Sequence, residues 1–284
     1  MKTSTSRQHG VKKSMKRRFK ANTATILTWV LALIYAFPIL YMLITGFKPE
    51  QQVAPPTLTF TPTLENYGAV IKQDLLLHSF NSVLITIATV ALTILLAIPA
   101  AYSLVFGSLK NADGVYYWFI TTTLLPAVAV VIPIFLVFNY TGLLDSRLGL
   151  VLLYTGAGVP LMIWMVRTFF TDVPYEIIEA ADIDGCTRFT SFFRIILPLV
   201  RGGIFSTSLL VFITTWNEFF FAVNMTYSKS ATLPVYLNRF LTQQGYFWAK
   251  MSAASTLVVV IPVILGFFTQ KTLVKGLTLG AVKG

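Results

Sequence analysis

Residues 167–201 read RTFFTDVPYEIIEAADIDGCTRFTSFFRIILPLVR, and this polar segment interrupts a chain that is otherwise strongly apolar. It carries nine charged side chains in 35 residues, whereas the flanking stretches 148–166 and 202–228 contain only one between them, Glu218. Each flanking stretch is long enough for a helix that crosses a bilayer, which needs about 20 apolar residues. The segment is therefore predicted to be a structured loop between two membrane spans.

The loop itself is predicted to fold as a helix, a tight turn and a second helix. Asp172 is expected to cap the first helix, which begins near Pro174 because proline suits a first turn. Gly185 supplies the left-handed residue that ends a helix, and Thr187 caps the second helix, which is expected to end before Pro198. One apolar stripe of the second helix is expected to face the membrane ends of the chain: Phe189, Phe192, Phe193 and Ile196.

The rest of the chain predicts an all-α polytopic membrane protein with six transmembrane helices. Only 12% of its 284 residues are charged, against about 25% in soluble domains, and 55% are hydrophobic. Two of the apolar stretches exceed one crossing and are expected to tilt or bend at Pro99, Pro126 and Pro133. The six stretches are residues 21–47, 75–109, 114–144, 148–166, 202–228 and 251–270.

The distribution of positive charge predicts a cytoplasmic N-terminus. Residues 1–20 hold eight Lys and Arg side chains and no acid, and such clusters stay on the cytoplasmic side of a membrane. Six crossings then place the C-terminus and residues 167–201 on the same side. The net charge of +11 predicts contact with anionic membrane lipids and no nucleic-acid partner, because the charges lie between apolar blocks. A cleaved signal peptide is not predicted, because its apolar region would span only about 7–15 residues.

The chain offers little chemistry for catalysis or metal binding. Its one cysteine, Cys186, forms no internal disulfide, and its two histidines, His9 and His78, are too far apart in sequence to indicate a metal site. No Ser/His/Asp or paired-carboxylate arrangement indicates an enzyme. The sequence also lacks the G-x-x-x-x-G-K-[ST] motif that binds nucleotide phosphates, so any ATPase must be a separate polypeptide.

Several motifs resemble those of one transporter family. Glu179-Ala180-Ala181, then Gly185 after three residues, then Ile195, Leu197 and Pro198 resemble the EAA motif of ATP-binding-cassette (ABC) importer permeases, EAA-x3-G-x9-I-x-L-P. The C-terminal sequence GLTLGAVKG and the segment Trp216-Asn217-Glu218-Phe219 resemble segments of MalG-like sugar permeases, and Asn81-Ser82 lies where the family's core begins. The resemblance covers about residues 79–284, and the preceding residues match only in layout.

This resemblance implies a type I ABC importer permease in a bacterial or archaeal inner membrane, and no enzyme. The implied parts are a basic cytoplasmic arm (1–20), a first span (21–47), an extracytoplasmic loop (48–78), a permease core (79–271) and a cytoplasmic tail (272–284). The implied partners are a second, MalF-like permease, two ATPase subunits and an extracytoplasmic solute-binding protein. ATP and Mg²⁺ are then bound by the ATPase subunits, and this chain holds no cofactor of its own.

The resemblance also assigns roles to particular residues. The EAA loop is implied to dock on the ATPase, with Glu179 pairing with a basic residue there; its residues are Glu179, Ala180, Ala181, Asp184, Gly185, Ile195, Leu197 and Pro198. The tail is implied to reach the ATPase pair through Gly280, Lys283 and Gly284. In the loop 227–250, the resemblance favours contact of Gln243, Gln244 and Tyr246 with the binding protein; an interfacial aromatic belt is the alternative.

Glu218 has two interpretations. An ionisable group inside a span tends to face a pathway or to bind a neighbouring helix. At 1.5 Å per residue it lies about 24 Å from the cytoplasmic end of its span, so with Asn217 it is a candidate for the outer pathway. A hydrogen bond to a neighbouring helix or to the partner subunit is the favoured interpretation. Two functions remain as alternatives to sugar import: an ABC importer for glycerol phosphate or another solute, and an ion-coupled carrier, which Glu218 as the only acid in a span disfavours.

Overall fold

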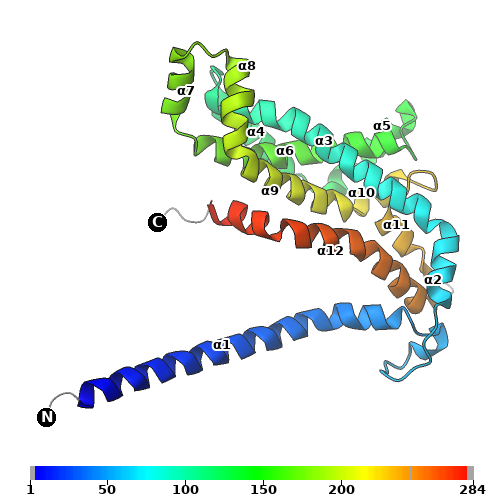
Figure 1. The fold of residues 1–284 in the computed structure, drawn as a ribbon. Coiled ribbons are helices and arrows are strands. Elements are labelled where there is room, and N and C mark those ends of the chain that lie inside the picture. The colour runs from blue at the N-terminus through cyan, green and yellow to red at the C-terminus, as the bar shows by residue number, and fades with distance from the viewer. Residues whose placement is uncertain (1–3, 243–244, 280–284) are drawn as a thin grey trace. The chain divides into compact units, whose positions relative to one another are not determined.

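The computed structural model describes residues 4–242 and 245–279, and these residues are almost entirely helical (Figure 1). The only strands in these two ranges are β1 (Leu241–Thr242) and β2 (Gly245–Tyr246), which form a short antiparallel pair. The fold separates into two units, residues 1–70 with 247–256 and residues 71–246 with 257–284. The predicted all-α fold class is confirmed.

The first unit contains the first span and the segment that follows it. Helix α1 (Ser4–Thr45) carries an apolar stretch at Thr23–Thr45, and η1 (Glu50–Gln52) and α2 (Glu65–Val70) follow. The Asn66 amide donates to the carbonyl oxygens of Gly46 and Lys48, at 3.1 and 2.7 Å, and so fixes the exit from α1. The Glu50 carboxylate accepts from the backbone N–H groups of Ala249 and Lys250 in the first turn of α12 (Trp248–Leu279), where a negative charge is favourable.

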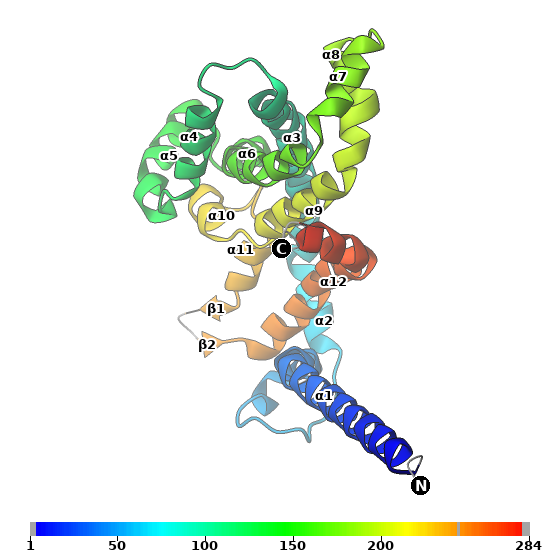
Figure 2. The same ribbon diagram turned by 90° about the vertical axis from the view of Figure 1, so that its left-hand side faces the viewer.

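Two long helices form the centre of the second unit. Helix α3 (Leu76–Phe106) and helix α6 (Arg147–Thr171) pack along each other more extensively than any other pair of elements, and α4 (Ala112–Thr123) and α9 (Leu197–Trp216) flank α6 (Figures 1 and 2). Buried apolar side chains from α3, α6 and α9 form one cluster. A second cluster joins α3, α5 (Ala127–Thr141) and α6 through Ile85, Phe138 and Leu150, so α3 and α6 contribute to both.

The predicted bend at Pro126 is confirmed. Helices α4 and α5 meet at an angle of 92°, and Pro126 is the residue that caps α5. Proline lacks a backbone N–H and restricts the residue before it, so it ends helices readily. Pro99 and Pro133 lie inside α3 and α5 without interrupting them.

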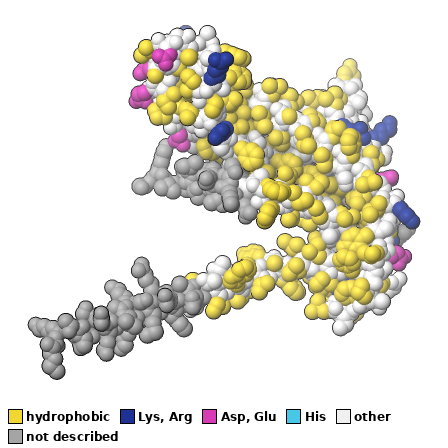
Figure 3. Space-filling model, viewed as in Figure 1, with side chains coloured by type: hydrophobic (Ala, Val, Ile, Leu, Met, Phe, Trp, Pro, Cys, Tyr) yellow, Lys and Arg dark blue, Asp and Glu magenta, His cyan; other side chains and the backbone are white. Residues whose placement is uncertain are grey.

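The described helices agree with the predicted number of spans. Five are long and apolar enough to cross a membrane, and the bent pair α4–α5 makes a sixth when counted as one span. Hydrophobic side chains cover the helices of the second unit, while charged side chains gather around α7 (Tyr175–Ile183) and α8 (Arg188–Thr190) at one end (Figure 3). This surface is that of a multi-pass membrane protein.

The helices differ from the simplest expectation in two places. The segment 48–78 contains η1, α2 and η2 (Ile71–Leu75), and η2 is kinked at Gln73 and Asp74, the latter with φ of 64°. The fifth apolar stretch is also not one helix, because α9 ends at Trp216 and a separate helix, α10 (Phe220–Met225), follows a three-residue break. Apolarity alone does not reveal the second break, since apolar residues lie on both sides of it.

Candidate functional site

The polar loop 167–201 forms a two-helix projection from the second unit, α7 followed by α8, as predicted (Figure 1). The turn between them is a Schellman motif: Cys186 N–H donates to Ala181 O at 2.9 Å, and Gly185 N–H donates to Asp182 O at 3.1 Å. Gly185 has φ of +76°, a conformation that costs residues with a side chain about 1–2 kcal/mol. The predicted role of Gly185 is therefore confirmed.

Three details of the predicted projection were wrong. Asp172 is the C-terminal cap residue of α6, and α7 starts after Pro174, which takes the N-cap position. The second helix does not end before Pro198. It continues from α8 through η3 (Ser191–Ile196) into α9, because Pro198 lies in the first turn of α9, where its missing N–H is tolerated. Thr187 does cap α8, since its hydroxyl accepts from Thr190 N–H at 3.2 Å.

The third wrong detail concerns the apolar stripe of the second helix, which is partly buried in the core and partly exposed at the surface. Phe192 and Ile196 are buried in the cluster formed by α3, α6 and α9, together with Ile178 of α7. Phe189 and Phe193 stack on each other with ring centroids 4.5 Å apart and are 74% and 47% exposed. The projection is thus rooted in the core on one side and presents an aromatic pair on the other.

The residues of the EAA motif lie on this projection, some of them exposed and others packed against the core. Glu179 and Ala180 are exposed on α7, Asp184 and Gly185 are exposed at the turn, and Ala181 is buried. The residues of the second helix, Ile195 and Leu197, pack against the core cluster from partly buried positions, and Pro198 is exposed. Glu179, Ala180, Asp184 and Gly185 therefore lie outward, while Ala181, Ile195 and Leu197 hold the projection to the bundle.

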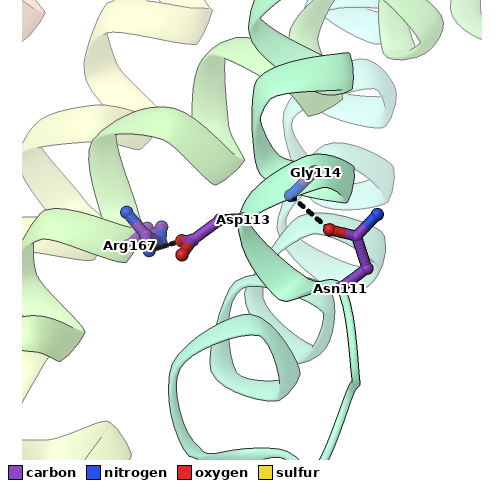
Figure 4. Close-up of polar contacts among 4 residues, drawn as sticks. All are labelled: Asn111, Asp113, Gly114 and Arg167. Atoms are coloured by element: carbon purple, nitrogen blue, oxygen red, sulfur yellow. Dashed lines mark hydrogen bonds and ion pairs between the residues drawn. The ribbon is translucent and has the colours of Figure 1, made fainter.

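An ion pair joins α6 to α4 next to the projection. Arg167 Nη2 donates to Asp113 Oδ1 at 2.8 Å, and Asn111 Oδ1 accepts from Gly114 N–H to cap α4 (Figure 4). The Arg167 guanidinium also lies 4.1 Å from the ring centroid of Tyr116, a cation–π contact. The pairing of Arg167 with Asp113 could not be predicted, because residues 54 positions apart in sequence give no pairing signal.

Glu218 lies in the break between α9 and α10. Its carboxylate accepts hydrogen bonds from the backbone N–H groups of Phe221 and Ala222, at 2.9 and 3.1 Å. It also accepts from the hydroxyl of Tyr154 on α6 at 2.7 Å. The favoured interpretation, a hydrogen bond to a neighbouring helix, is confirmed. Asn217 is exposed, and its amide donates to Ile213 O at 2.8 Å in its own helix.

A polar network holds the loop after α10 against α3 and α6. The Asn81 amide donates to the carbonyl oxygens of Lys229 and Ala231, both at 3.0 Å, and Ser82 Oγ accepts from Leu233 N–H at the start of α11 (Leu233–Asn238). Asn81 is fully buried and also accepts from Arg147 Nε at 2.7 Å. The Asn81-Ser82 pair noted in the sequence thus anchors a loop about 150 residues away.

Asp145, in the turn between α5 and α6, secures the same loop. Its role was not predicted from the sequence. Its carboxylate accepts from the Ser230 hydroxyl and from four consecutive backbone N–H groups, those of residues 227–230, at 3.0–3.3 Å. Burial raises the pKa of Asp145, but these backbone hydrogen bonds outweigh that effect and lower the pKa to about 2. A carboxylate that satisfies five donors at once, four N–H groups and one hydroxyl, fixes the loop firmly.

Asp145→Asn is expected to lower the stability of the purified protein by about 1–2 kcal/mol, because an amide cannot accept four N–H bonds. The pKa of Asp145 is about 2, against 3.8 for an unperturbed Asp, so its contribution is complete above pH 3.8 and is lost as the pH falls toward 2. The melting temperatures of the wild type and of Asp145→Asn should therefore differ by the same amount at pH 7 and at pH 5. Asp113→Asn, at an exposed site, is the control. A difference that shrank between pH 7 and 5 would contradict the assignment.

The remaining predicted contacts are outside the described residues. Gln243 and Gln244 lie between β1 and β2 in the undescribed gap, and only the backbone of Tyr246 is described. The tail residues Gly280, Lys283 and Gly284 also lie outside the described ranges. Their roles remain predictions.

Comparison with known proteins identifies the family to which this helical membrane protein belongs. A multi-pass helical protein with a structured polar projection has the architecture of a membrane transport subunit. Residues 64–278 match the family described as binding-protein-dependent transport system inner membrane component, and the chain belongs to this family. It is accordingly a permease subunit of an ABC importer and not an enzyme; ATP is hydrolysed by separate ATPase subunits.

Individual relatives agree with this assignment. The probable ABC transporter permease protein y4oR of Sinorhizobium fredii is 35% identical, over 91% of this chain and 94% of that protein. The diacetylchitobiose uptake system permease protein DasC of Streptomyces coelicolor is 33% identical, over 96% of this chain and 100% of that protein. A crystal structure of a bacterial ABC transporter involved in the import of the acidic polysaccharide alginate shares the fold, with a TM-score of 0.75, 22% identity, and coverage of 90% of this chain and 96% of that one.

Proposed function

We propose that this chain and a second, MalF-like permease form the membrane pathway of an ABC importer for a sugar or oligosaccharide. A 33% identical relative is named for diacetylchitobiose uptake, and a transporter of the same fold is described as importing alginate. Both cargoes are carbohydrates, and these names support the proposed cargo class. The chain itself supplies no ATP site, so ATP and Mg²⁺ belong to the two ATPase subunits.

The projection is the part that receives force from the ATPase, and its construction is the observation that carries the proposal. Glu179 is exposed on α7, where it can reach a basic residue of a partner, while Ile178 one position earlier is buried in the core cluster. Tyr102 of α3 contacts Phe192 of the second helix, with ring centroids 4.7 Å apart. A helix packed in this way moves with the spans beneath it, whereas a loose loop would absorb the motion.

The proposed function also includes an orientation of the chain in the membrane. Contact with cytoplasmic ATPase subunits requires the projection and both chain termini to be cytoplasmic, in agreement with the basic residues 1–20. Contact of Gly280, Lys283 and Gly284 with the ATPase pair is part of this proposal. The loop with Gln243, Gln244 and Tyr246 lies on the extracytoplasmic side, where the solute-binding protein delivers its cargo.

Asn217 and Glu218 are proposed to line the outer part of the pathway. Asn217 is exposed beside a helix break, and breaks of this kind in membrane proteins occur where the backbone is buried in protein or lines a cavity. The side chain of Glu218 is only partly buried although its carboxylate is bonded. In this position the Glu218 carboxylate can stabilise the break between α9 and α10 and also face the cargo in the pathway.

Cargo class is tested by purifying the importer from its source cell through a tag on this chain, together with the binding protein that associates with it. We expect calorimetric titration of that binding protein to show binding of at least one member of a panel of mono-, di- and oligosaccharides. Uptake of the same sugar should be lost when the gene for this chain is deleted and restored by the intact gene. Binding of glycerol 3-phosphate or amino acids without any sugar would overturn the carbohydrate assignment.

A further inference from the structure

A polar hollow of about 500 Å³ lies at the N-terminal end of α6. Arg147 and Lys229 line it, together with Asp145, Ser146 and Ser230, so two positive side chains and one negative side chain share the same small space. The first turn of α6 adds partial positive charge from its backbone N–H groups. The hollow is therefore suited to an anion.

The one carboxylate of the hollow is already occupied. Asp145 accepts from four backbone N–H groups and from the Ser230 hydroxyl, which uses its oxygens within the chain. The Arg167–Asp113 ion pair is elsewhere, and neither Arg147 nor Lys229 forms a salt bridge with a carboxylate of the described residues. Arg147 and Lys229 consequently present positive charge that no carboxylate of the described chain pairs with directly.

The buried side chain of Asn81 fixes the Arg147 side chain and the backbone of Lys229. Asn81 accepts from Arg147 Nε at 2.7 Å through its oxygen and donates to the backbone carbonyl of Lys229 through its amide nitrogen. Phe80 lies beneath the Arg147 guanidinium, 5.4 Å from its central carbon to the ring centroid. Groups that are positioned before binding lose less conformational entropy when a ligand arrives.

The hollow lies at the opposite end of a membrane span from the projection. Helix α6 has 25 residues, and at 1.5 Å per residue it is about 37 Å long, with Arg147 at its start and the projection after its end. If the projection is cytoplasmic, as the proposed function requires, the hollow opens on the extracytoplasmic side. The protein that approaches this side is the solute-binding protein.

We propose that Arg147 and Lys229 form a docking site for a carboxylate side chain, Asp or Glu, on the solute-binding protein. This inference rests on the proposed function for the orientation of the chain. Arg147 can bind a carboxylate through its terminal guanidinium nitrogens, while the exposed ammonium of Lys229 attracts the same group as a point charge. The contact speeds encounter and fixes the orientation of the binding protein over the pathway.

The test uses the complete importer in nanodiscs of phosphatidylcholine, with ATPase activity measured against increasing concentrations of sugar-loaded binding protein. Lys229→Gln, Arg147→Gln and the double variant are compared with Lys72→Gln, which removes an exposed charge outside the hollow. We expect the half-saturating concentration to rise about tenfold in the double variant at an unchanged maximal rate, and its dependence on salt to weaken. The Lys72 control should match the wild type.

Several outcomes would overturn the docking site. An unchanged half-saturating concentration in Lys229→Gln and in the double variant would do so. An effect that appears only when phosphatidylglycerol is added would assign the hollow to a lipid head group instead. Loss of maximal rate or of thermal stability in Lys229→Gln would indicate a structural role. Failure of the binding protein to stimulate the wild-type importer would count against the proposed function and not against these two residues specifically.

Discussion

Gly185→Val is expected to reduce sugar uptake by about tenfold or more while the protein still inserts into the membrane. Gly185 has φ of +76°, and a side chain in this region costs about 1–2 kcal/mol, more when it is branched at Cβ. No atom lies within 4 Å of the added Cβ, so the expected effect is backbone strain at the turn and not a clash. Strain there would unwind the end of α7 and misalign Glu179. Uptake and ATP hydrolysis are measured together in proteoliposomes containing the whole importer.

Gly142→Val is the matched control for this change. Gly142 ends α5 with φ of +70° and also has open space around its Cβ position, so it carries the same backbone strain far from the projection in sequence. Both variants should lose similar thermal stability, but only Gly185→Val should lose association with the ATPase and coupled transport. Glu179→Lys should uncouple transport without any loss of stability, since Glu179 is exposed. Normal coupling in Gly185→Val and Glu179→Lys would defeat the assignment of α7.

Glu218→Ala is expected to destabilise the protein by about 3 kcal/mol or more and to abolish most uptake. The change leaves the Tyr154 hydroxyl and the N–H groups of Phe221 and Ala222 without their acceptor, and each unsatisfied buried group costs about 1–3 kcal/mol. For a protein of this size that loss corresponds to a fall in melting temperature of about 6–10 °C. The measurement is the melting temperature of the purified importer, with uptake assayed in parallel.

Two companion variants separate the structural role of Glu218 from a pathway role. Tyr154→Phe combined with Glu218→Ala should recover part of the lost stability, because the orphaned hydroxyl is then absent. Asn217→Ala should leave the melting temperature unchanged, since its amide is exposed and bonds only within its own helix. If Asn217 lines the pathway, this variant should raise the sugar concentration required for half-maximal uptake. Additive losses in the double variant would show that Tyr154 and Glu218 are not coupled.

Local features of the sequence predicted the projection because its signals are themselves local. The capping hydroxyl of Thr187, the left-handed Gly185 and the proline-induced bend at Pro126 each act on backbone within a few residues. The prediction for Pro198 was wrong because proline is common both after the end of a helix and in the first turn of one. Its place in the first turn of α9 depends on continuous packing from Phe192 and Ile196 into the core.

The long-range polar contacts could not be predicted in this way. Asp145 and the loop 227–230 are more than 80 residues apart, and Asn81 is about 150 residues from the carbonyl groups it binds. Asn81 was noted in the sequence only for its place at the start of the family's core, and Asp145 not at all, since a lone Asp or Asn near a span normally indicates a turn or a cap. Tyr154 likewise reads as one more aromatic residue in an apolar helix.

The sequence by itself determined the membrane class, the number of spans and the two-helix projection, because apolar length, charge placement and turn residues act through solvent and local backbone geometry. The tertiary structure decided which polar groups inside and beside the spans find partners. Burial in a low-dielectric bundle requires such partners, and only the packing of α3 against α6 and of the loop after α10 brings Asn81, Asp145 and Glu218 to theirs.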